Sequence, residues 1–184
     1  MLTLYYAPGT ASLCVHQFLI ELGVEHRLEK VDTDAKQQKS PEYLKLNPGG
    51  VVPTLVVDGE PMVESSAMLM WLAEQDPQAR FVPGDGGRAR RDYLQWFLLL
   101  ANGLQPPFRA WFYPEEPAGE SATDAVKASA RLRIEGMWDR VNAHLEQNGP
   151  YVCGAQLTAA DFFLFMLCRW SRNMPKPATE WPYL

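Results

Sequence analysis

The chain has 184 residues, of which 47% are hydrophobic, and its 17 basic and 22 acidic side chains give a net charge of −5. This length suits one domain of ordinary size or two small ones, and the composition is that of a globular protein. The negative charge argues against a nucleic-acid partner or an anionic membrane surface. No apolar run approaches the roughly 18 residues that a membrane span needs, and the first residues do not form a secretory signal.

The charge is unevenly distributed along the chain. Residues 1–76 contain 5 basic and 11 acidic groups, whereas residues 77–184 contain 12 basic and 11 acidic groups. The stretch DPQARFVPGDGG lies at this break and is rich in turn-forming residues. We therefore predict a first domain over residues 1–76, a linker over residues 77–87 and a second domain over residues 88–184.

The cysteines and histidines are few and scattered. Three cysteines occur at Cys14, Cys153 and Cys168, and three histidines occur at His16, His26 and His144. No CxxC pair is present, so the spacing predicts neither a zinc site nor a dithiol redox pair. This pattern favours a cytoplasmic protein whose thiols serve as small buried apolar groups.

The first half alternates predicted strands and helices. The short β-rich run Leu2–Tyr6 predicts a strand, and apolar residues at helical spacing predict a helix from Ser12 to Leu22 that ends at Gly23. Residues 26–31 read as a second strand. The polar stretch 32–46 reads as partly helical.

A β-hairpin is the clearest local signal. The dipeptide Asp58-Gly59 lies between the apolar runs 53–57 and 60–63, which is typical of a tight hairpin turn. A helix follows from Ser65 to about Glu74. We expect its buried face to be made by Ala67, Met68, Leu69, Trp71 and Leu72. The order βαβ and then ββα predicts a small mixed sheet with helices on its faces.

The second half contains no convincing strand. One helix begins near Ala89, and Pro106-Pro107 should kink or end it. An acidic loop follows, and then a long helix over about residues 122–147. A third helix opens at Thr158, with Asp161 three residues later forming an acidic version of a capping box. Residues 162–170 are apolar all round, so we expect this helix to be buried.

Four ordered motifs cover nearly the whole chain: LYYAPGTASL, NPGGVVPTLVVDG, ESSAMLMWLAE and YVCGAQLTAADFFLF. In this order the chain resembles the cytosolic glutathione transferases, most closely their bacterial beta-like branch. The resemblance implies an α/β plus all-α architecture, with an N-terminal thioredoxin-like βαβ-ββα domain and an all-helical C-terminal domain. It also implies glutathione as co-substrate, no metal, and a homodimer.

The resemblance assigns roles to residues that hold glutathione. Pro53 matches a cis-proline that presents the backbone of Val52 to the cysteinyl unit. Glu64 and Ser65 match the pair that binds the γ-glutamyl end, and a helix start is a favourable place for a carboxylate. Lys36 matches a basic residue that reaches the glycyl carboxylate. On the sequence alone, Ser65 would be a helix cap, Pro53 an ordinary trans-proline and Lys36 a solvated side chain.

The group that activates the thiol departs from the beta-like branch. That branch has a cysteine where this chain has Ala11, and a histidine and a lysine where this chain has Gln105 and Pro106. A mixed disulfide between glutathione and residue 11 is therefore excluded. Three changes at one site indicate a different chemistry.

Hydroxyl groups remain near the first turn. Lowering a thiol pKa from about 8.5 to about 6.5 takes about 2.7 kcal/mol. One hydrogen bond to a charged group contributes about 1.5–3 kcal/mol, and a helix start about 0.3–1 kcal/mol. One hydroxyl therefore suffices, and we favour Ser12, with Thr10 second. Tyr6 alternates with Leu4 on the strand and is expected to be buried, and Cys14 is a remote candidate.

The expected activity is conjugation of glutathione to small hydrophobic electrophiles, as in detoxification. The alternatives are a glutathione-dependent isomerase, lyase or peroxidase on the same fold, and a non-catalytic binding protein. Phe108, Trp111 and Tyr113 are candidates for the electrophile pocket, although such a stripe is more often core. The chain stops at Leu184, before the last helices of the family, which predicts a more open acceptor site or lower stability.

Overall fold

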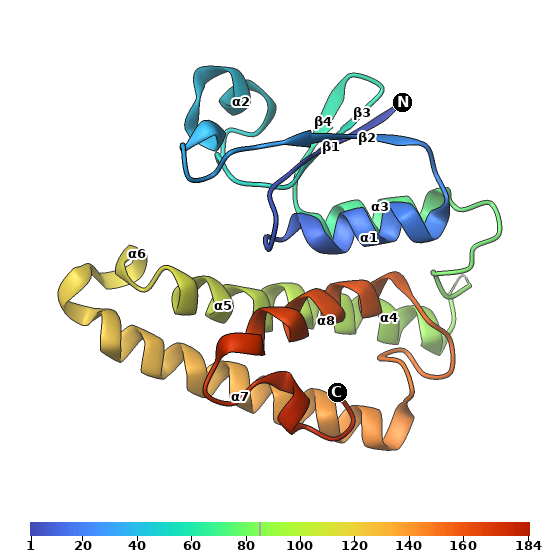
Figure 1. The fold of residues 1–184 in the computed structure, drawn as a ribbon. Helices are drawn as coiled ribbons and strands as arrows, with labels where there is room; N and C mark the ends of the chain where they lie inside the picture. The colour runs from blue at the N-terminus through green and yellow to red at the C-terminus, as the bar shows by residue number, and fades with distance from the viewer. Residues whose placement is uncertain (85) are drawn as a thin grey trace. The chain divides into compact units, whose positions relative to one another are not determined.

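The computed structural model describes residues 1–84 and 86–184, which form two compact units, Met1–Val82 and Pro83–Leu184 (Figure 1). The predicted linker 77–87 contains residue 85, which lies outside the described residues. The first unit is an α/β structure and the second is helical. This confirms the predicted fold class.

A four-stranded mixed sheet organises the first unit, in the order β2-β1-β3-β4. Its strands are β1 Leu2–Tyr6, β2 His26–Lys30, β3 Thr54–Val57 and β4 Glu60–Met62. Strand β1 pairs in parallel with β2 and antiparallel with β3, with Tyr5 opposite Thr54. Strands β3 and β4 form the predicted hairpin.

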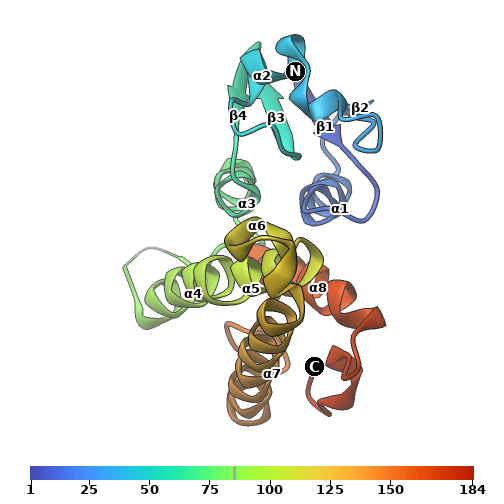
Figure 2. The same cartoon turned by 90° about the vertical axis from the view of Figure 1, so that its left-hand side faces the viewer.

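Two helices cover one face of this sheet, as Figures 1 and 2 show: α1 Ser12–Leu22 and α3 Ser65–Gln75. The short helix α2 Pro41–Leu46 lies on the other side. Helix α1 has its predicted bounds, and Gly23 ends it at φ 70°, a conformation that glycine adopts without a steric cost. The buried face of α3 differs slightly from the prediction: Ala67 and Trp71 are half-buried, and Ala73 is fully buried.

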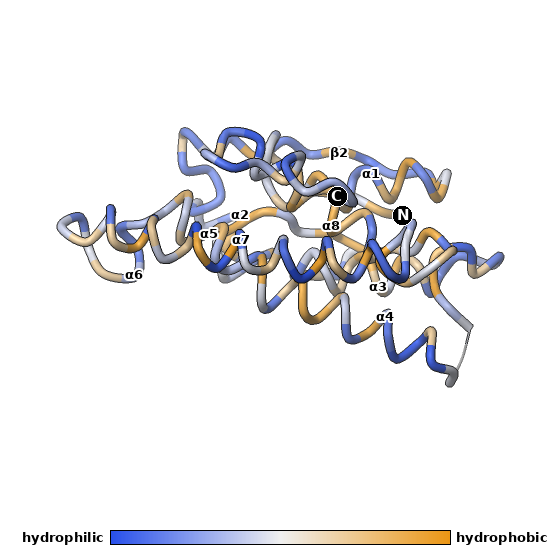
Figure 3. The backbone as a smooth tube through the Cα atoms, turned by 90° about the horizontal axis from the view of Figure 1, so that it is seen from below, coloured by the Kyte–Doolittle hydropathy of each residue, from blue (hydrophilic) through white to orange (hydrophobic). Residues whose placement is uncertain are grey.

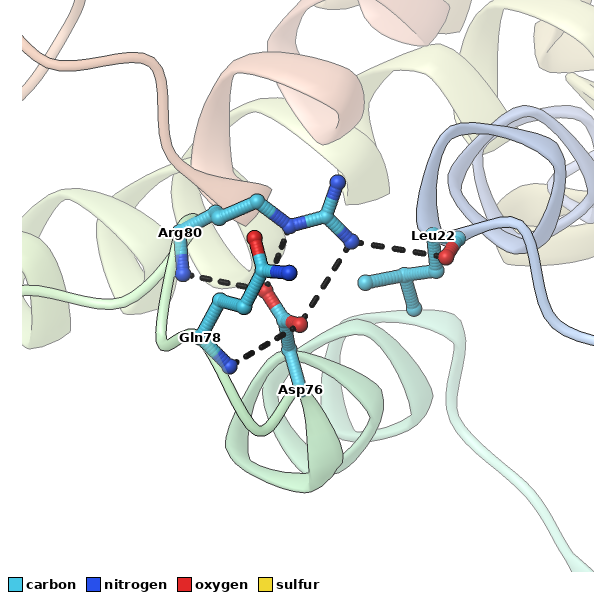
Figure 4. A network of polar contacts seen from close by, with 4 residues as sticks. All are labelled: Leu22, Asp76, Gln78 and Arg80. Atoms are coloured by element: carbon cyan, nitrogen blue, oxygen red, sulfur yellow. Dashed lines mark hydrogen bonds and ion pairs between the residues drawn. The ribbon is translucent and has the colours of Figure 1, made fainter.

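A polar network joins the ends of α1 and α3 (Figure 4). The Arg80 guanidinium donates to the Asp76 carboxylate at 2.9 Å and to the Leu22 carbonyl at 3.4 Å. The Asp76 carboxylate also accepts from the backbone N–H groups of Arg80 and Gln78. The Arg80 contact and these hydrogen bonds lower the pKa of Asp76. The Arg80 side chain, held by the Asp76 carboxylate, thus ties the segment after α3 to the Leu22 carbonyl at the end of α1.

The second unit is built from helices α4 Arg88–Leu99, α5 Gln105–Phe112, α6 Glu115–Ala118, α7 Thr123–Asn148 and α8 Ala159–Trp170. Figure 3 shows hydrophobic and hydrophilic residues alternating along the turns of α4. The predicted break at Pro106-Pro107 takes a specific form. A π-helical segment, Leu100–Leu104, joins α4 to α5, and the prolines fall in the first turn of α5, where they need no N–H partner. Short helix α6 was not predicted, and an ion pair between Glu116 and Arg109 (2.6 Å) supports it.

The predicted capping box at α8 is confirmed. The Asp161 carboxylate accepts from the Thr158 N–H and hydroxyl at 2.8 and 2.9 Å, and from the Val152 N–H at 2.8 Å. The expectation that the whole of α8 is buried was wrong: Phe165 and Arg169 are exposed, and Phe162, Cys168 and Trp170 are half-buried. Phe165 is 52% exposed, because only one face of the helix meets the core of this unit.

The segment after α8 packs against α7. The Trp181 indole, which is buried, donates to the Asp139 carboxylate at 2.7 Å. One turn further along α7, the Asn142 side chain accepts from the Tyr183 N–H at 3.0 Å. Among the described residues, no helix combines the length and apolarity needed to cross a membrane.

The His16 ring contacts the His26 ring at 5.7 Å between centroids. The pKa of His16 is lowered, first by burial and second by the charge of His26. The folded chain therefore binds fewer protons than the unfolded chain, where a histidine has a pKa of about 6.5. Stability from this group is intact above that value and is lost as the pH falls through the folded pKa.

We expect the free energy of unfolding in urea to fall between about pH 8 and about pH 5.5, and to fall less in His16→Gln. The measurement is a urea titration followed by circular dichroism at both pH values. An equal fall in the wild type and in His16→Gln would contradict the assignment to His16.

Candidate active site

The topology of the first unit brings the predicted glutathione-binding segments to one end of the sheet. Because Tyr5 pairs with Thr54, the end of β1 lies beside the start of β3, which follows Pro53. Because β2 runs parallel to β1, the segment that leads to Lys36 leaves from the same end. Helices α1 and α3, which carry the other predicted site residues at their starts, also contact each other.

A cluster of hydroxyl groups lies where β1 turns into α1. The Thr10 and Ser12 oxygens are 2.8 Å apart. Both hydroxyls contact the Ala7 carbonyl, at 2.8 Å from Thr10 and 2.9 Å from Ser12. The Ala7 N–H donates to the Ser12 oxygen at 3.3 Å. The Ser12 N–H, which belongs to the first turn of α1, donates to the Thr10 oxygen at 3.3 Å.

The two hydroxyls differ in their access to a ligand. Ser12 is 2% exposed and its oxygen is held on both sides by Ala7, whereas Thr10 is half-buried. Each hydroxyl carries one proton and two lone pairs. Thr10 also donates to the Ala7 carbonyl, so its proton reaches an incoming anion by exchanging that hydrogen bond for one to the ligand. The arrangement therefore offers one donor at a helix start, where the dipole also favours negative charge.

The segment before β3 is held by one side chain of α2 and by the residue that follows this helix. The Val52-Pro53 peptide bond is cis, as the resemblance implies. The Val51 carbonyl, next to it, accepts from the Tyr43 hydroxyl and from the Asn47 amide, both at 2.8 Å. Tyr43 also contacts the Thr54 hydroxyl at 2.9 Å. Sequence reasoning missed these two supports, although the turn signal Asn47-Pro48-Gly49-Gly50 marks the position of Asn47.

The start of α3 has an unusual backbone. Glu64 is a non-glycine residue with φ 71°, a conformation that side chains disfavour and that clusters at functional sites. It is exposed, and its carbonyl accepts from the Met68 N–H at 2.9 Å, which begins the helix. Ser65 follows as the first helical residue and is 5% exposed. A carboxylate and a hydroxyl thus lie next to the free N–H groups of a helix start.

Two lysines lie in the segment between β2 and α2. Lys36 is exposed and also has a positive φ of 56°. Lys39 donates to the Gly49 carbonyl at 3.3 Å, so it sits beside the loop that leads to Val52. A Cβ atom on Gly50 would lie within 3.0 Å of the Gln38 carbonyl, which explains a glycine there. Sequence reasoning named Lys36 and missed Lys39.

The cysteines are unreactive by position. Burial raises the pKa of Cys14 and of Cys168 to about 12, and that of Cys153 to about 11. Cys14 is fully buried. Tyr6 is half-buried instead of buried, with its ring 6.2 Å from that of His16. The hydroxyl pair therefore remains the candidate activator of a thiol.

The aromatic residues that were candidates for the electrophile pocket lie partly in the core and partly at the surface. Phe108 is fully buried among Trp138, Trp170 and Phe112, so it belongs to the core. Tyr113 is exposed beneath the Arg109 guanidinium, 4.7 Å from the ring centre. A cavity of about 360 Å³ near Cys168 is lined by residues of the second unit and includes none of the predicted site residues. Within residues 1–84 and 86–184, no three His, Cys, Asp or Glu side chains are grouped to hold a metal ion.

Comparison with known proteins matches both units to one family. Residues 12–75 match the glutathione S-transferase N-terminal domain, and residues 124–184 match its C-terminal domain. The chain is 34% identical over 172 residues to glutathione S-transferase GST-4.5 of Xanthomonas campestris, covering 92% of this chain and 82% of that protein. The chain belongs to the glutathione S-transferase family.

Further similarities agree with this assignment. Glutathione S-transferase GstA of Escherichia coli O157:H7 is 30% identical over 170 residues, covering 91% of this chain and 81% of that protein. A crystal structure of a glutathione transferase homologue from Sulfitobacter with bound glutathione superposes with a TM-score of 0.91 at 28% identity. That superposition covers 100% of this chain and 88% of the other. The family assignment and fold inferred from the sequence motifs are thereby confirmed.

The raised thiol pKa values lead to a labelling prediction. At about pH 8, a thiol with a pKa of 12 is ionised in about one molecule in 10,000, and the thiolate is the nucleophile. We expect iodoacetamide to leave Cys14 and Cys168 unlabelled in the native transferase and to label both in urea. Mass spectrometry of peptides reads out each site. Rapid native labelling of Cys14 would show that this thiol is reactive and would reopen its candidacy.

Proposed function

We propose that this transferase activates the thiol of glutathione with the hydroxyl pair Thr10 and Ser12 and adds the thiolate to small hydrophobic electrophiles. The observation that carries this proposal is the 2.8 Å contact between the two hydroxyls at the start of α1. The hydroxyl pair flanks residue 11, which is an alanine in this chain and has no polar side chain that could contact the sulfur. The Sulfitobacter homologue, described as having bound glutathione, supports the choice of co-substrate.

Glutathione is held at both ends in this proposal. Ser65 and the N–H groups of the first turn of α3 bind the γ-glutamyl carboxylate, and Glu64 accepts from the ammonium group. The backbone of Val52, ahead of Pro53, pairs with the cysteinyl unit. Lys36 reaches the glycyl carboxylate. These contacts fix the sulfur near the hydroxyl pair, and such positioning is a large part of what an enzyme contributes.

Thr10 is the hydroxyl that we place in contact with the sulfur. The sequence favoured Ser12, but its oxygen is almost fully enclosed by Ala7. We therefore propose that Ser12 supports Thr10 through the hydrogen bond between their two hydroxyls. A hydrogen bond from Thr10 to the thiolate is worth about 1.5–3 kcal/mol, which lowers the pKa of the bound thiol by about one to two units.

The chemical step needs only the two substrates. The thiolate attacks an electrophilic carbon and a sulfur–carbon bond forms. With an aryl halide, the carbon–halogen bond then breaks and halide leaves with its electron pair. With an enone, the electrons move to the carbonyl oxygen and a proton is taken from solvent. We further propose that the protein works as a cytoplasmic homodimer in detoxification.

A conjugation assay tests the activity. We expect purified protein to accelerate addition of glutathione to an aryl halide such as 1-chloro-2,4-dinitrobenzene, followed by absorbance of the thioether. Epoxides, enones and peroxides are assayed in parallel to find the preferred class. Binding of glutathione without acceleration of any of these reactions would contradict catalysis and favour a binding protein.

Variants at residues 10 and 12 test the roles of the hydroxyls. We expect Thr10→Val to raise the pKa of the bound thiol by about one to two units and to lower kcat near pH 6.5 by about 10- to 100-fold. Thr10→Ser is the matched control because it keeps the hydroxyl. The thiolate is measured by its ultraviolet absorbance across pH, and glutathione affinity by calorimetry.

Ser12→Ala should lower turnover more than it weakens glutathione binding, since it removes the support of Thr10 but no contact to the peptide. Full activity in Thr10→Val together with loss of activity in Ser12→Ala would assign the direct contact to Ser12 instead.

A further inference from the structure

The Val51 carbonyl accepts hydrogen bonds from two buried side chains that the proposed chemistry does not use. The Tyr43 hydroxyl and the Asn47 amide each donate to it at 2.8 Å. Tyr43 is 5% exposed and Asn47 is 4% exposed, whereas Val51 is 41% exposed. A carbonyl oxygen has two lone pairs, so these two donors occupy its full accepting capacity.

This carbonyl belongs to the same peptide unit as the Val52 N–H, which lies next to Pro53. The unit is planar and its bond is trans, so its C=O and N–H point in opposite directions. Donors that fix the oxygen therefore also fix the direction of the N–H. Among the residues that the structure describes, none accepts from the Val52 N–H or donates to the Val52 carbonyl, so both groups are available to a ligand.

Tyr43 is itself held by the two strands that meet at this end of the sheet. Its ring meets the Tyr5 ring of β1 edge-on, at 5.9 Å between centroids, and its hydroxyl contacts the Thr54 hydroxyl of β3 at 2.9 Å. Because the Tyr43 proton goes to the Val51 carbonyl, Thr54 is the donor in this contact. Burial raises the pKa of Tyr43, so the hydroxyl keeps the proton that it donates.

Asn47 is held by the turn that follows α2. Its Oδ1 atom accepts from the Gly49 N–H at 3.0 Å, while its NH2 group donates to the Val51 carbonyl. The Lys39 ammonium donates to the Gly49 carbonyl at 3.3 Å, and a Cβ atom on Gly50 would lie 2.8 Å from the Lys39 nitrogen. The second donor thus comes from a turn that is closely packed and hydrogen-bonded.

We propose that Tyr43 and Asn47 are positioning residues that aim the Val52 N–H at the carbonyl of the cysteinyl unit of glutathione. This inference rests on the proposed function. Hydrogen bonds accepted by a C=O also polarise the N–H of the same peptide unit, and a group already held in its bound orientation loses less freedom when a ligand binds. The two side chains act on the peptide backbone of glutathione, whereas Thr10 and Ser12 act on its thiol.

Four substitutions separate donation to the carbonyl from packing. Tyr43→Phe keeps the ring and removes both hydroxyl contacts, whereas Thr54→Val removes only the contact between the two hydroxyls. Asn47→Ala removes the second donor. Tyr183→Phe is the matched control, because it removes an exposed tyrosine hydrogen bond of the second unit.

Three measurements are made on each variant. Calorimetry gives the dissociation constants of glutathione and of γ-glutamyl-alanyl-glycine, a peptide with the same backbone and no sulfur. NMR gives the nitrogen chemical shift of the Val52 amide in the free protein, which responds to hydrogen bonds at the carbonyl of its peptide unit. Thermal unfolding gives the stability.

We expect Tyr43→Phe and Asn47→Ala each to weaken binding of both peptides by about threefold to tenfold, the effect of one lost hydrogen bond. The loss should be equal for the two peptides, and the Val52 amide signal should move. Thr54→Val should lower the unfolding midpoint but bind both peptides within about twofold of the wild type. Tyr183→Phe should bind equally well and leave the Val52 signal unchanged.

Three results would overturn the inference. Wild-type affinity in Tyr43→Phe and in Asn47→Ala would show that the donors do not act on the site. An equal loss in Thr54→Val and Tyr43→Phe would show that stability of the segment sets the affinity. A loss for glutathione alone would place the effect on the thiol. If Tyr43→Phe does not fold, Asn47→Ala against Tyr183→Phe still decides.

Failure of the proposed function gives a different result. If the wild-type protein binds neither peptide, the glutathione site is rejected and the role of Tyr43 and Asn47 with it. Binding of both peptides without conjugation of glutathione rejects catalysis, and the affinities of the variants then still decide the positioning role.

Discussion

The antiparallel pairing of β1 with β3 is the constraint on which the candidate site depends. Because Tyr5 lies opposite Thr54, the end of the first strand and the start of the third are neighbours. The turn to α1 and the cis bond before Pro53 therefore occur at the same end of the sheet. A register shift by one residue would turn every side chain of β3 to the other face and separate these segments.

In the proposed function, the hydroxyl pair acts on the glutathione thiol in a protein whose own thiols are not ionised. A hydroxyl stays neutral across physiological pH and can donate to an anion without itself ionising. The three cysteines of this chain are all held as neutral thiols by burial. The thiolate of the bound peptide then has no competitor among the protein's thiols. In the proposed function, the hydroxyl pair supplies the contact to the sulfur that Ala11 cannot make.

Local sequence patterns predicted most helices and strands correctly. They did not predict contacts between residues that are far apart in the sequence. The helix Ser12–Leu22 and the capping box at Thr158 depend on neighbours in sequence, so both were predicted correctly. The enclosure of the Ser12 hydroxyl depends on how the turn after β1 closes, and the hydrogen bond from Tyr43 to the Val51 carbonyl joins α2 to the loop before β3. The exposed Phe165 has the same cause, since hydropathy alone does not tell which face of an apolar helix meets the core.

The backbone at Glu64 supports a binding role for this residue independently of the family motifs. Its φ of 71° is a conformation that glycine adopts freely and that other residues adopt at a cost of about 1–3 kcal/mol. A glutamate at this position thus lowers stability relative to glycine, and its exposed side chain makes no buried contact that would offset the cost. A carboxylate beside the start of α3 is useful if a ligand carries both an ammonium and a carboxylate group. In the proposed function, the free N–H groups bind the carboxylate and Glu64 binds the ammonium, and the γ-glutamyl end of glutathione presents this combination.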